Sequence, residues 1–287
     1  MSLRRMTVPA VFVVMALIAW LCARPGAESG FVYAAPNGRP LRLDLDYPAG
    51  PGPRPVVVFL PHRGDWGPEF KRDDRCRRLV TALTARGYAV ATLHYRVAGD
   101  DRFPAQIEDV KAAVCWLRAN AVALGLNTER IGAVGVSAGG YGVCMLGTTG
   151  LGDGFDPPGE SPVAARVQAV VALGAPADFT TPLSPLAEHQ YLHPFMGKRR
   201  SDDPALYARA SPGTYATSDD PPFLLIHSAG DLLVPVAQSR AFTAQLRRAG
   251  VSVELVEEDG NLHVWGGDRL DRTLERVGPF LDRHLRE

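Results

Sequence analysis

The chain has 287 residues, 46% of them hydrophobic and 22% charged, which is enough apolar material for one large hydrophobic core. Lys and Arg together number 31, as do Asp and Glu, so the formal net charge is zero. A balanced chain has no general attraction to nucleic acid or to an anionic membrane surface. The composition therefore excludes a strongly basic nucleic-acid-binding protein and favours a small molecule or a neutral polymer as the partner.

The first residues have the pattern of an export signal. Arg4 and Arg5 precede a continuous apolar run over residues 8–22, which Pro25 and several small residues follow. A run of about fifteen residues is short for a helix that crosses a bilayer, which needs about twenty. We therefore predict that residues 1–27 are a signal peptide or an N-terminal membrane anchor. The protein is expected to be periplasmic or secreted, or to be tethered to a membrane through this segment alone.

Three cysteines follow the N-terminal segment, Cys76, Cys115 and Cys144, and each lies inside a predicted helix. Exported proteins can form disulfides, but the odd number favours buried thiols that act as small hydrophobic side chains. No pair of these cysteines has the spacing of a zinc site or of a redox motif. We expect neither a metal nor an organic cofactor.

Beyond residue 27, the chain alternates apolar runs with helical patterns. Pro36-Asn37-Gly38 is a turn signal between extended runs at residues 31–35 and 41–47, which predicts an N-terminal antiparallel hairpin. Residues 56–60 are apolar on both faces, which is typical of a strand in a parallel sheet covered by helices. Further strands are expected at residues 88–95, 131–136, 167–173, 223–227 and 251–256, and helices before residue 87, at 105–125, after 137, at 236–250 and at 268–285. This order predicts an α/β fold with a mostly parallel central sheet and helices on both faces.

Residues 181–221 interrupt the alternation with a stretch rich in Pro, Ser, Asp and His. A long irregular segment in a compact domain is usually functional. We predict that it is an irregular, cap-like insertion that covers a binding site, with a plain surface insertion as the alternative. Residues 28–287 are otherwise expected to form a single domain.

The motif Gly135-Val136-Ser137-Ala138-Gly139-Gly140 stands between an apolar strand and an apolar helix. In that context, small neighbours allow a serine to occupy a tight strand-to-helix turn that exposes its hydroxyl. A G-x-S-x-G string alone is weak evidence in a glycine-rich chain, but the strand at residues 131–136 makes it far more specific. We predict that Ser137 is a catalytic nucleophile.

A serine hydroxyl is a poor nucleophile until a base takes its proton, and that base is itself held by a carboxylate. In hydrolases with this turn, the chain order is serine, acid, histidine, each after a strand. Asp231 follows the strand at residues 223–227, and His263 follows the strand at residues 251–256. We predict that His263 is the general base and that Asp231 orients it. The alternatives are that Asp231 caps the next helix and that His263 is a surface-loop residue.

Beyond the serine motif, the chain resembles one family over nearly all of its length after the N-terminal segment. The matching segments are residues 38–44, 62–66, 95–96, 103–110, 116–118, 210–212, 221–222 and 230–235. They resemble the α/β-hydrolase esterase/lipase group that includes acetylxylan and feruloyl esterases and is akin to hormone-sensitive-lipase-like carboxylesterases. The resemblance implies an α/β-hydrolase fold and a serine esterase that cleaves short acyl or aryl esters. Small-molecule esters and acylated carbohydrates, including polysaccharides, are the implied substrates.

One loop departs from the family pattern. Members typically have His-Gly-Gly-Gly-Trp after the third strand, whereas this chain has His62-Arg63-Gly64-Asp65-Trp66. Backbone N–H groups of this loop and of the residue after the nucleophile bind the oxyanion in such enzymes. The resemblance therefore implies an oxyanion hole formed by Ala138 and Gly64, with Arg63 or Asp65 as a further donor. Replacing two glycines can shift the loop, because glycine adopts backbone angles that other residues disfavour.

Two other functions stay open. One is a serine peptidase that resembles the prolyl-oligopeptidase catalytic domain, although that domain normally accompanies a large propeller. The other is a degenerate hydrolase that binds a ligand without turnover, which the altered oxyanion loop supports and the intact Ser137, Asp231 and His263 pattern opposes.

Overall fold

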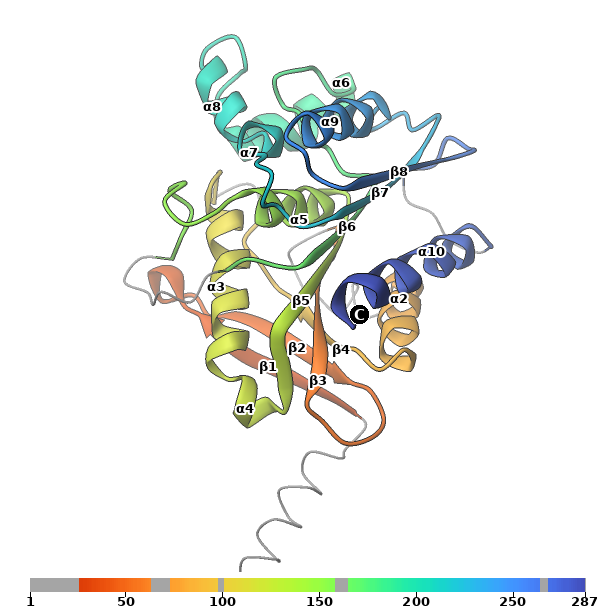
Figure 1. Ribbon diagram of the computed structural model, residues 1–287. Helices are drawn as coiled ribbons and strands as arrows, with labels where there is room; N and C mark the ends of the chain where they lie inside the picture. Colours follow the sequence, from red (N-terminus) through yellow and green to blue (C-terminus); the bar gives the residue numbers. More distant parts are fainter. Residues whose placement is uncertain (1–25, 63–72, 98–100, 158–164, 264–267, 287) are drawn as a thin grey trace, which may run out of the picture.

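The computed structural model describes residues 26–62, 73–97, 101–157, 165–263 and 268–286 (Figure 1). The described residues form one sheet of eight strands in the order β1-β2-β4-β3-β5-β6-β7-β8. The strands are β1 (Gly26–Ala34), β2 (Leu41–Tyr47), β3 (Arg54–Leu60), β4 (Ala89–Leu93), β5 (Leu126–Val136), β6 (Ala169–Leu173), β7 (Phe223–Ser228) and β8 (Val253–Glu258). β1 pairs with β2 and β2 with β4 in antiparallel fashion, and every other pairing is parallel.

Helices cover both faces of this sheet (Figure 1). One face carries α2 (Asp74–Ala85) and α10 (Asp268–Leu285), and the other carries α3 (Ala105–Ala119), α4 (Ala121–Leu124), α5 (Ala138–Thr148) and α9 (Ala237–Arg248). Successive residues of β3 alternate between the two cores, because side chains of a strand point to opposite faces in turn. Val56 and Val58 pack with α3 and α5, whereas Val57 and Phe59 pack with α2 and α10. The predicted fold class, with its N-terminal antiparallel hairpin, is confirmed.

Two strands extend beyond their predicted limits. β5 begins at Leu126, and its first residues pair with Arg54 and Pro55 across an irregularity in the β3 register. β1 begins at Gly26, where it pairs with Tyr47. The first strand thus includes residues 26 and 27, which the sequence had assigned to the N-terminal segment.

The insertion at residues 181–221 is a series of short helical turns, whereas the sequence predicted an irregular segment. The turns are α6 (Pro185–Ala187), the π-helical turn η3 (Glu188–Leu192), α7 (His193–Met196), α8 (Pro204–Arg209) and the 3-10 turn η4 (Pro212–Thr214). The Ser184 and Asp203 side chains cap α6 and α8, and proline fits the first turn of a helix. The Pro, Ser and Asp residues that suggested irregularity therefore serve as helix starts. A cover over a binding site stays a prediction.

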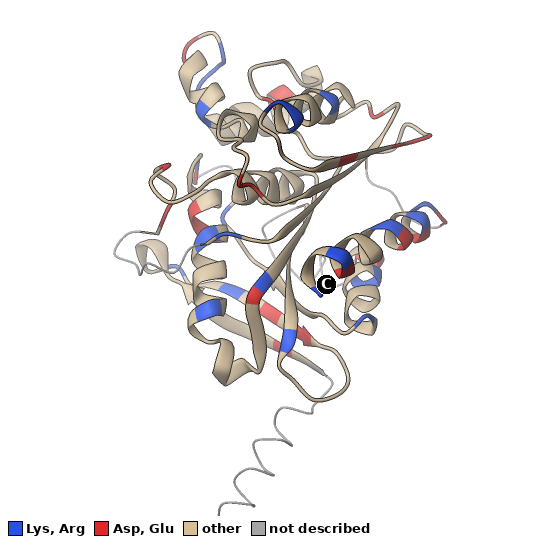
Figure 2. Cartoon of the chain, viewed as in Figure 1, with Lys and Arg blue, Asp and Glu red and all other residues tan. Residues whose placement is uncertain are grey.

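Charges of both signs are interspersed along α10, and the central strands carry few charged residues (Figure 2). Cys76, Cys115 and Cys144 are not joined in disulfides, and Cys76 and Cys144 are buried as expected, whereas Cys115 is partly exposed. Within the described ranges, every helix is too short or too polar to cross a membrane. The predicted N-terminal segment lies almost wholly outside those ranges.

Candidate active site

Ser137 occupies the turn between β5 and α5 in a backbone conformation that is unusual for a side-chain-bearing residue. Its φ is 54° and its ψ is −115°. Its amide donates to the carbonyl of Leu173, at the end of the neighbouring strand β6, over 2.8 Å. A Cβ atom at Gly135 or Gly139 would overlap backbone atoms, of Gly139 in the first case and of Leu60 in the second. The two glycines of the motif are thus required by close backbone approach.

His263 lies between Ser137 and Asp231. Its Nε2 is 2.7 Å from the Ser137 hydroxyl oxygen, and its Nδ1 is 2.7 Å from Oδ2 of Asp231. An ionised carboxylate accepts hydrogen bonds but has no hydrogen to donate. Nδ1 of His263 therefore carries the hydrogen, and the Nε2 lone pair faces the serine hydroxyl. The structure therefore brings together the three residues that the sequence singled out, in the geometry that proton transfer from serine requires.

The Asp231 carboxylate is held from several directions. Its Oδ1 accepts the amides of Leu233 at 2.9 Å and Val234 at 3.0 Å. Burial alone would raise the pKa of this carboxyl group, but hydrogen bonds with His227 and His263 outweigh burial and lower the pKa. The side chain is fully buried and yet stays ionised, as a partner for a histidine must be.

Another aspartate follows the neighbouring strand β6, and its hydrogen-bond partners differ from those of Asp231. Asp178 comes after β6 and is buried like Asp231. Its Oδ1 accepts from the amide of Thr180 over 2.9 Å and from the Thr180 hydroxyl. The backbone around it is tied to α9 by Gln238, whose amide oxygen accepts from the amides of Ala177 and Asp178. Asp178 is therefore engaged in its own turn, and Asp231 is the carboxylate that reaches the histidine.

The loops that carry Asp231 and His263 are joined. The amide of Ala229 donates to the Glu258 carbonyl over 2.8 Å, and the amide of Gly230 donates to the Gly260 carbonyl over 2.9 Å. The Ser228 hydroxyl donates to the carbonyl of Leu262, directly before His263, over 2.6 Å. Loop backbone needs such partners when it is partly buried, and here they fix one loop against the other.

The predicted oxyanion-binding residues are placed in part. Ala138 is the first residue of α5, and the N–H groups of a first helical turn have no partner within the helix. Gly64 and Arg63 lie outside the described residues, so their role stays a prediction. The described base of their loop is held in place, because Tyr95 donates its hydroxyl hydrogen to the Pro61 carbonyl over 2.6 Å. Tyr95 thus supports the described beginning of this loop.

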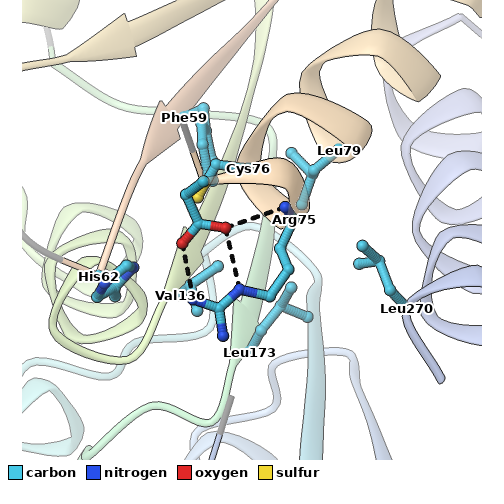
Figure 3. A pocket seen from close by; sticks show the side chains of 9 residues that line it. Phe59, His62, Arg75, Cys76, Leu79, Val136, Leu173 and Leu270 are labelled. Carbon is cyan, nitrogen blue, oxygen red and sulfur yellow. Dashed lines mark hydrogen bonds and ion pairs between the residues drawn. The ribbon is translucent and has the colours of Figure 1, made fainter. Parts of the chain in front are cut away.

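A small, largely apolar pocket lies beside this loop, between the ends of β3, β5 and β6 and the helices α2 and α10 (Figure 3). Among the described residues, His62, Asp73 and Cys76 at its edge are close enough to be considered as metal ligands. Both Asp73 oxygens, however, bind the Arg75 guanidinium, at 3.0 and 2.7 Å. Burial raises the pKa of the Cys76 thiol to about 12, which keeps it protonated near neutral pH. In this cluster, Asp73 is therefore engaged by Arg75, and Cys76 is not a thiolate.

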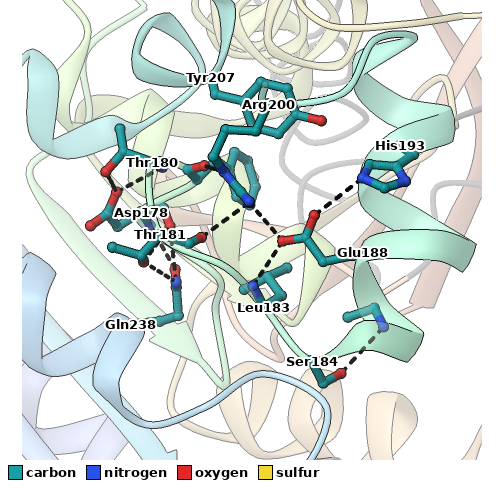
Figure 4. Close-up of polar contacts among 12 residues, drawn as sticks. Asp178, Thr180, Thr181, Leu183, Ser184, Glu188, His193, Arg200, Tyr207 and Gln238 are labelled. Atoms are coloured by element: carbon teal, nitrogen blue, oxygen red, sulfur yellow. Dashed lines mark hydrogen bonds and ion pairs between the residues drawn. The ribbon is translucent and has the colours of Figure 1, made fainter. Parts of the chain in front are cut away.

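The insertion is fastened to the chain after β6 through Glu188 and Arg200 (Figure 4). Arg200 donates to Glu188 over 2.6 Å and to the carbonyl of Phe179 over 2.6 Å. Glu188 also accepts the amide of Leu183 over 2.8 Å, and His193 lies 3.3 Å from its other oxygen. These contacts hold the turn η3 and the segment around Arg200 against the chain that follows β6.

The sequence did not reveal the buried polar residues around the acid. His227 and Ser228 end β7, and Ser239 lies on α9; all three are buried. Their signal in the sequence is faint: a His-Ser pair closes the otherwise apolar run Phe223-Leu224-Leu225-Ile226. A polar pair at the end of a buried strand must find partners in the fold, and here those partners are the loops that carry Asp231 and His263.

Known proteins resemble this chain over most of its length. The family model described as BD-FAE matches residues 43–246. Esterase LipQ of Mycobacterium tuberculosis is 32% identical over 250 residues, which are 84% of this chain and 58% of LipQ. The chain thus spans less than two thirds of the length of this relative.

Solved structures show the same fold. The bifunctional GH43-CE protein of Bacteroides eggerthii matches with a TM-score of 0.77 and 28% identity, over 90% of this chain and 38% of that one. Thermogutta terrifontis esterase 2 with butyrate bound matches with a TM-score of 0.71 and 26% identity, over 90% and 94% of the two chains. The resemblance to α/β-hydrolase esterases that the sequence indicated is confirmed.

Proposed function

This chain belongs to the BD-FAE family, and we propose that it is a serine carboxylic ester hydrolase that works through an acyl-enzyme intermediate. The observation that carries the proposal is the continuous hydrogen-bonded path from Ser137 through His263 to Asp231, with both contacts at 2.7 Å. Its relative LipQ is named an esterase, in agreement with the proposal.

In the first half-reaction, Ser137 Oγ attacks the ester carbonyl carbon while His263 Nε2 takes its proton. The tetrahedral oxyanion accepts a hydrogen bond from the Ala138 amide and, on this proposal, from Gly64 and Arg63 or Asp65. His263 then returns the proton to the departing alcohol, which leaves an acyl group on Ser137.

In the second half-reaction, water replaces the alcohol. His263 takes a proton from the water as its oxygen attacks the acyl carbon, and the Ser137 oxygen leaves with that proton. Asp231 keeps the hydrogen on Nδ1 throughout and stabilises the imidazolium that forms in each half. Every proton in this cycle moves between the substrate, water and the two side chains of Ser137 and His263.

We propose short acyl or aryl esters as substrates, including those on acylated carbohydrates. Butyrate bound to Thermogutta terrifontis esterase 2 supports a short acyl group. The resemblance to acetylxylan and feruloyl esterases supports a carbohydrate or aryl ester, and the zero net charge suits a neutral polymer. Arg4, Arg5 and the apolar run that follows them support export, or a membrane tether, as the location where such esters would be met.

The test is release of p-nitrophenol from acetate and butyrate esters by the protein and by its Ser137→Ala variant. We expect turnover by the protein and a loss of about 10³-fold or more in the variant, because the nucleophile is gone while binding persists. Circular dichroism and the unfolding temperature confirm that both are folded. Equal rates in the two proteins would contradict Ser137 as nucleophile, and no turnover in either would support a binding protein instead.

A further inference from the structure

A second histidine lies beside the acid of the candidate site. His227 is fully buried near the carboxyl end of β7. Its Nε2 is 2.9 Å from the carbonyl oxygen of Val234 and 3.5 Å from Oδ2 of Asp231. Its Nδ1 is 2.7 Å from the hydroxyl oxygen of Ser239 on α9. Both ring nitrogens therefore have a partner, and neither partner is the nucleophile.

The partners fix which nitrogen carries the hydrogen. A carbonyl oxygen only accepts, so Nε2 of His227 must donate to Val234. The Ser239 hydroxyl can donate to Nδ1, which completes the set of contacts and keeps the ring in one orientation. Nε2–H then points toward the turn that contains Asp231 and lies near the same carboxylate oxygen that binds His263.

Val234 is the link between this histidine and the acid. Its amide donates to Oδ1 of Asp231 at 3.0 Å, while its carbonyl accepts from His227. The turn from Asp231 to Val234 is thus closed on itself through the carboxylate and anchored to β7 through the imidazole. Without this anchor, the Val234 carbonyl would be buried without a donor, and the turn would be free to rotate the carboxylate away from His263.

We propose that His227 is a positioning residue that holds the Asp231 carboxylate in line with His263, with Ser239 fixing the orientation of its ring. The inference rests on the proposed esterase function, in which the hydrogen bond between Asp231 and His263 orients the general base. His227 acts through Asp231 and Val234 and contacts neither Ser137 nor the ester.

Two substitutions of His227 by an amide residue distinguish a positioning role from a role in packing alone. In His227→Gln, the side-chain nitrogen can reach the place of Nε2 and donate to Val234. In His227→Asn, the shorter side chain can meet Ser239 but leaves Val234 without its donor. We expect kcat of the Gln variant to stay within about threefold of the wild type and kcat of the Asn variant to fall about a hundredfold, with KM little changed. His284→Asn, on α10 against the Phe280 ring, is the matched control and should keep the wild-type kcat.

A readout that does not need turnover is the low-field proton resonance of the hydrogen bond between His263 and Asp231, assigned by its loss in His263→Ala. It should persist in the Gln variant and shift or broaden in the Asn variant. If the wild type shows no esterase turnover but the resonance responds this way, the proposed function fails and the positioning role stands. Equal kcat and an unchanged resonance in both variants overturn the positioning role.

Ser239→Ala tests the same inference should the Asn variant not fold. It removes the partner of Nδ1 and leaves the donor to Val234 in place. We expect kcat to fall by about tenfold and the low-field resonance to broaden, because the ring loses its fixed orientation. A wild-type kcat with an unchanged resonance in this variant would overturn the role given to the pair.

Discussion

The two ends of β7 each carry an aspartate whose side chain is buried, and the two carboxyl groups differ in acidity. Asp220 precedes the strand, and its side chain is 2% exposed. Asp231 follows the strand, and its side chain is fully buried. Burial raises the pKa of Asp220 to about 6, whereas the pKa of Asp231 is lowered. Equal burial thus gives opposite results at the two ends.

The difference lies in the donors that each carboxylate receives. Asp220 accepts hydrogen bonds from Thr217, from its amide at 2.9 Å and from its hydroxyl at 3.2 Å. The guanidinium of Arg166 is 3.5 Å from the Asp220 carboxylate and donates to the carbonyl of Asp219. Asp231 accepts hydrogen bonds from two amides and from His263, and the Nε2 of His227 lies 3.5 Å from its Oδ2. A buried carboxylate stays charged when donors surround it, and the end of β7 that supplies them is the end with the candidate site.

Among changes at the two ends of β7, Asp231→Asn should have the largest effect on kcat, because it removes the charge and presents an N–H to His263. The imidazole is then held in the wrong tautomer, and we expect kcat to fall about 10⁴-fold. Asp178→Asn is the matched control, because it makes the same change at a buried aspartate after β6. It should keep kcat within a few-fold while losing about 1 kcal/mol of unfolding free energy. Similar kcat losses in both variants would remove the distinction between the two acids.

Ser228→Ala, at the same end of β7, should lower kcat less than Asp231→Asn does. The variant loses the donor to the Leu262 carbonyl and the partner of Arg269, whose guanidinium bonds the Ser228 oxygen over 2.6 Å. We expect a fall of about tenfold in kcat, because the loop before His263 is less firmly placed. Ser252→Ala, at an exposed site before β8, controls for loss of a hydroxyl and should leave kcat unchanged. A wild-type kcat in Ser228→Ala would show that the backbone bonds between the loops suffice.

The smallest effect on kcat is expected at the amino end of β7, in Asp220→Asn, where the consequence is for stability. The folded pKa of Asp220 lies above its unfolded value, so its contribution to stability is present at low pH and is lost as the pH rises through about 6. Asparagine does not ionise, so the stability of the variant relative to the wild type should rise by about 2 kcal/mol between pH 4 and pH 7. Urea unfolding across this range measures the difference. A gap that stays constant with pH would show that Asp220 does not titrate in this range.

Much of this arrangement could be predicted from the sequence, because it depends on local patterns and chain order. The apolar run before Ser137 and the glycines around it predicted the tight strand-to-helix turn. The positions of Asp231 and His263 after strands predicted the acid and the base. Their meeting at 2.7 Å follows from parallel strands whose carboxyl ends share one edge.

The contacts of His227 and Ser228 could not be predicted in this way. Their partners, Val234 and Leu262, are brought to the end of β7 by the packing of separate loops and have no spacing rule. The helical turns of the insertion were not predicted for a different reason. Helices of three to six residues are too short to show the hydrophobic periodicity that predicts a helix. The roles of Gly64 and Arg63 stay predictions, because their loop lies outside the described residues.

The backbone of Ser137, with its positive φ of 54°, has a consequence for the history of the chain. A side-chain-bearing residue in such a region costs about 1 to 3 kcal/mol, and glycine occupies it with far less penalty. A Ser137→Gly change would therefore give a more stable protein that has lost its nucleophile. In a lineage released from selection for turnover, drift at this position should run toward glycine. The serine hydroxyl is thus exposed at this turn at a cost in the stability of the folded chain.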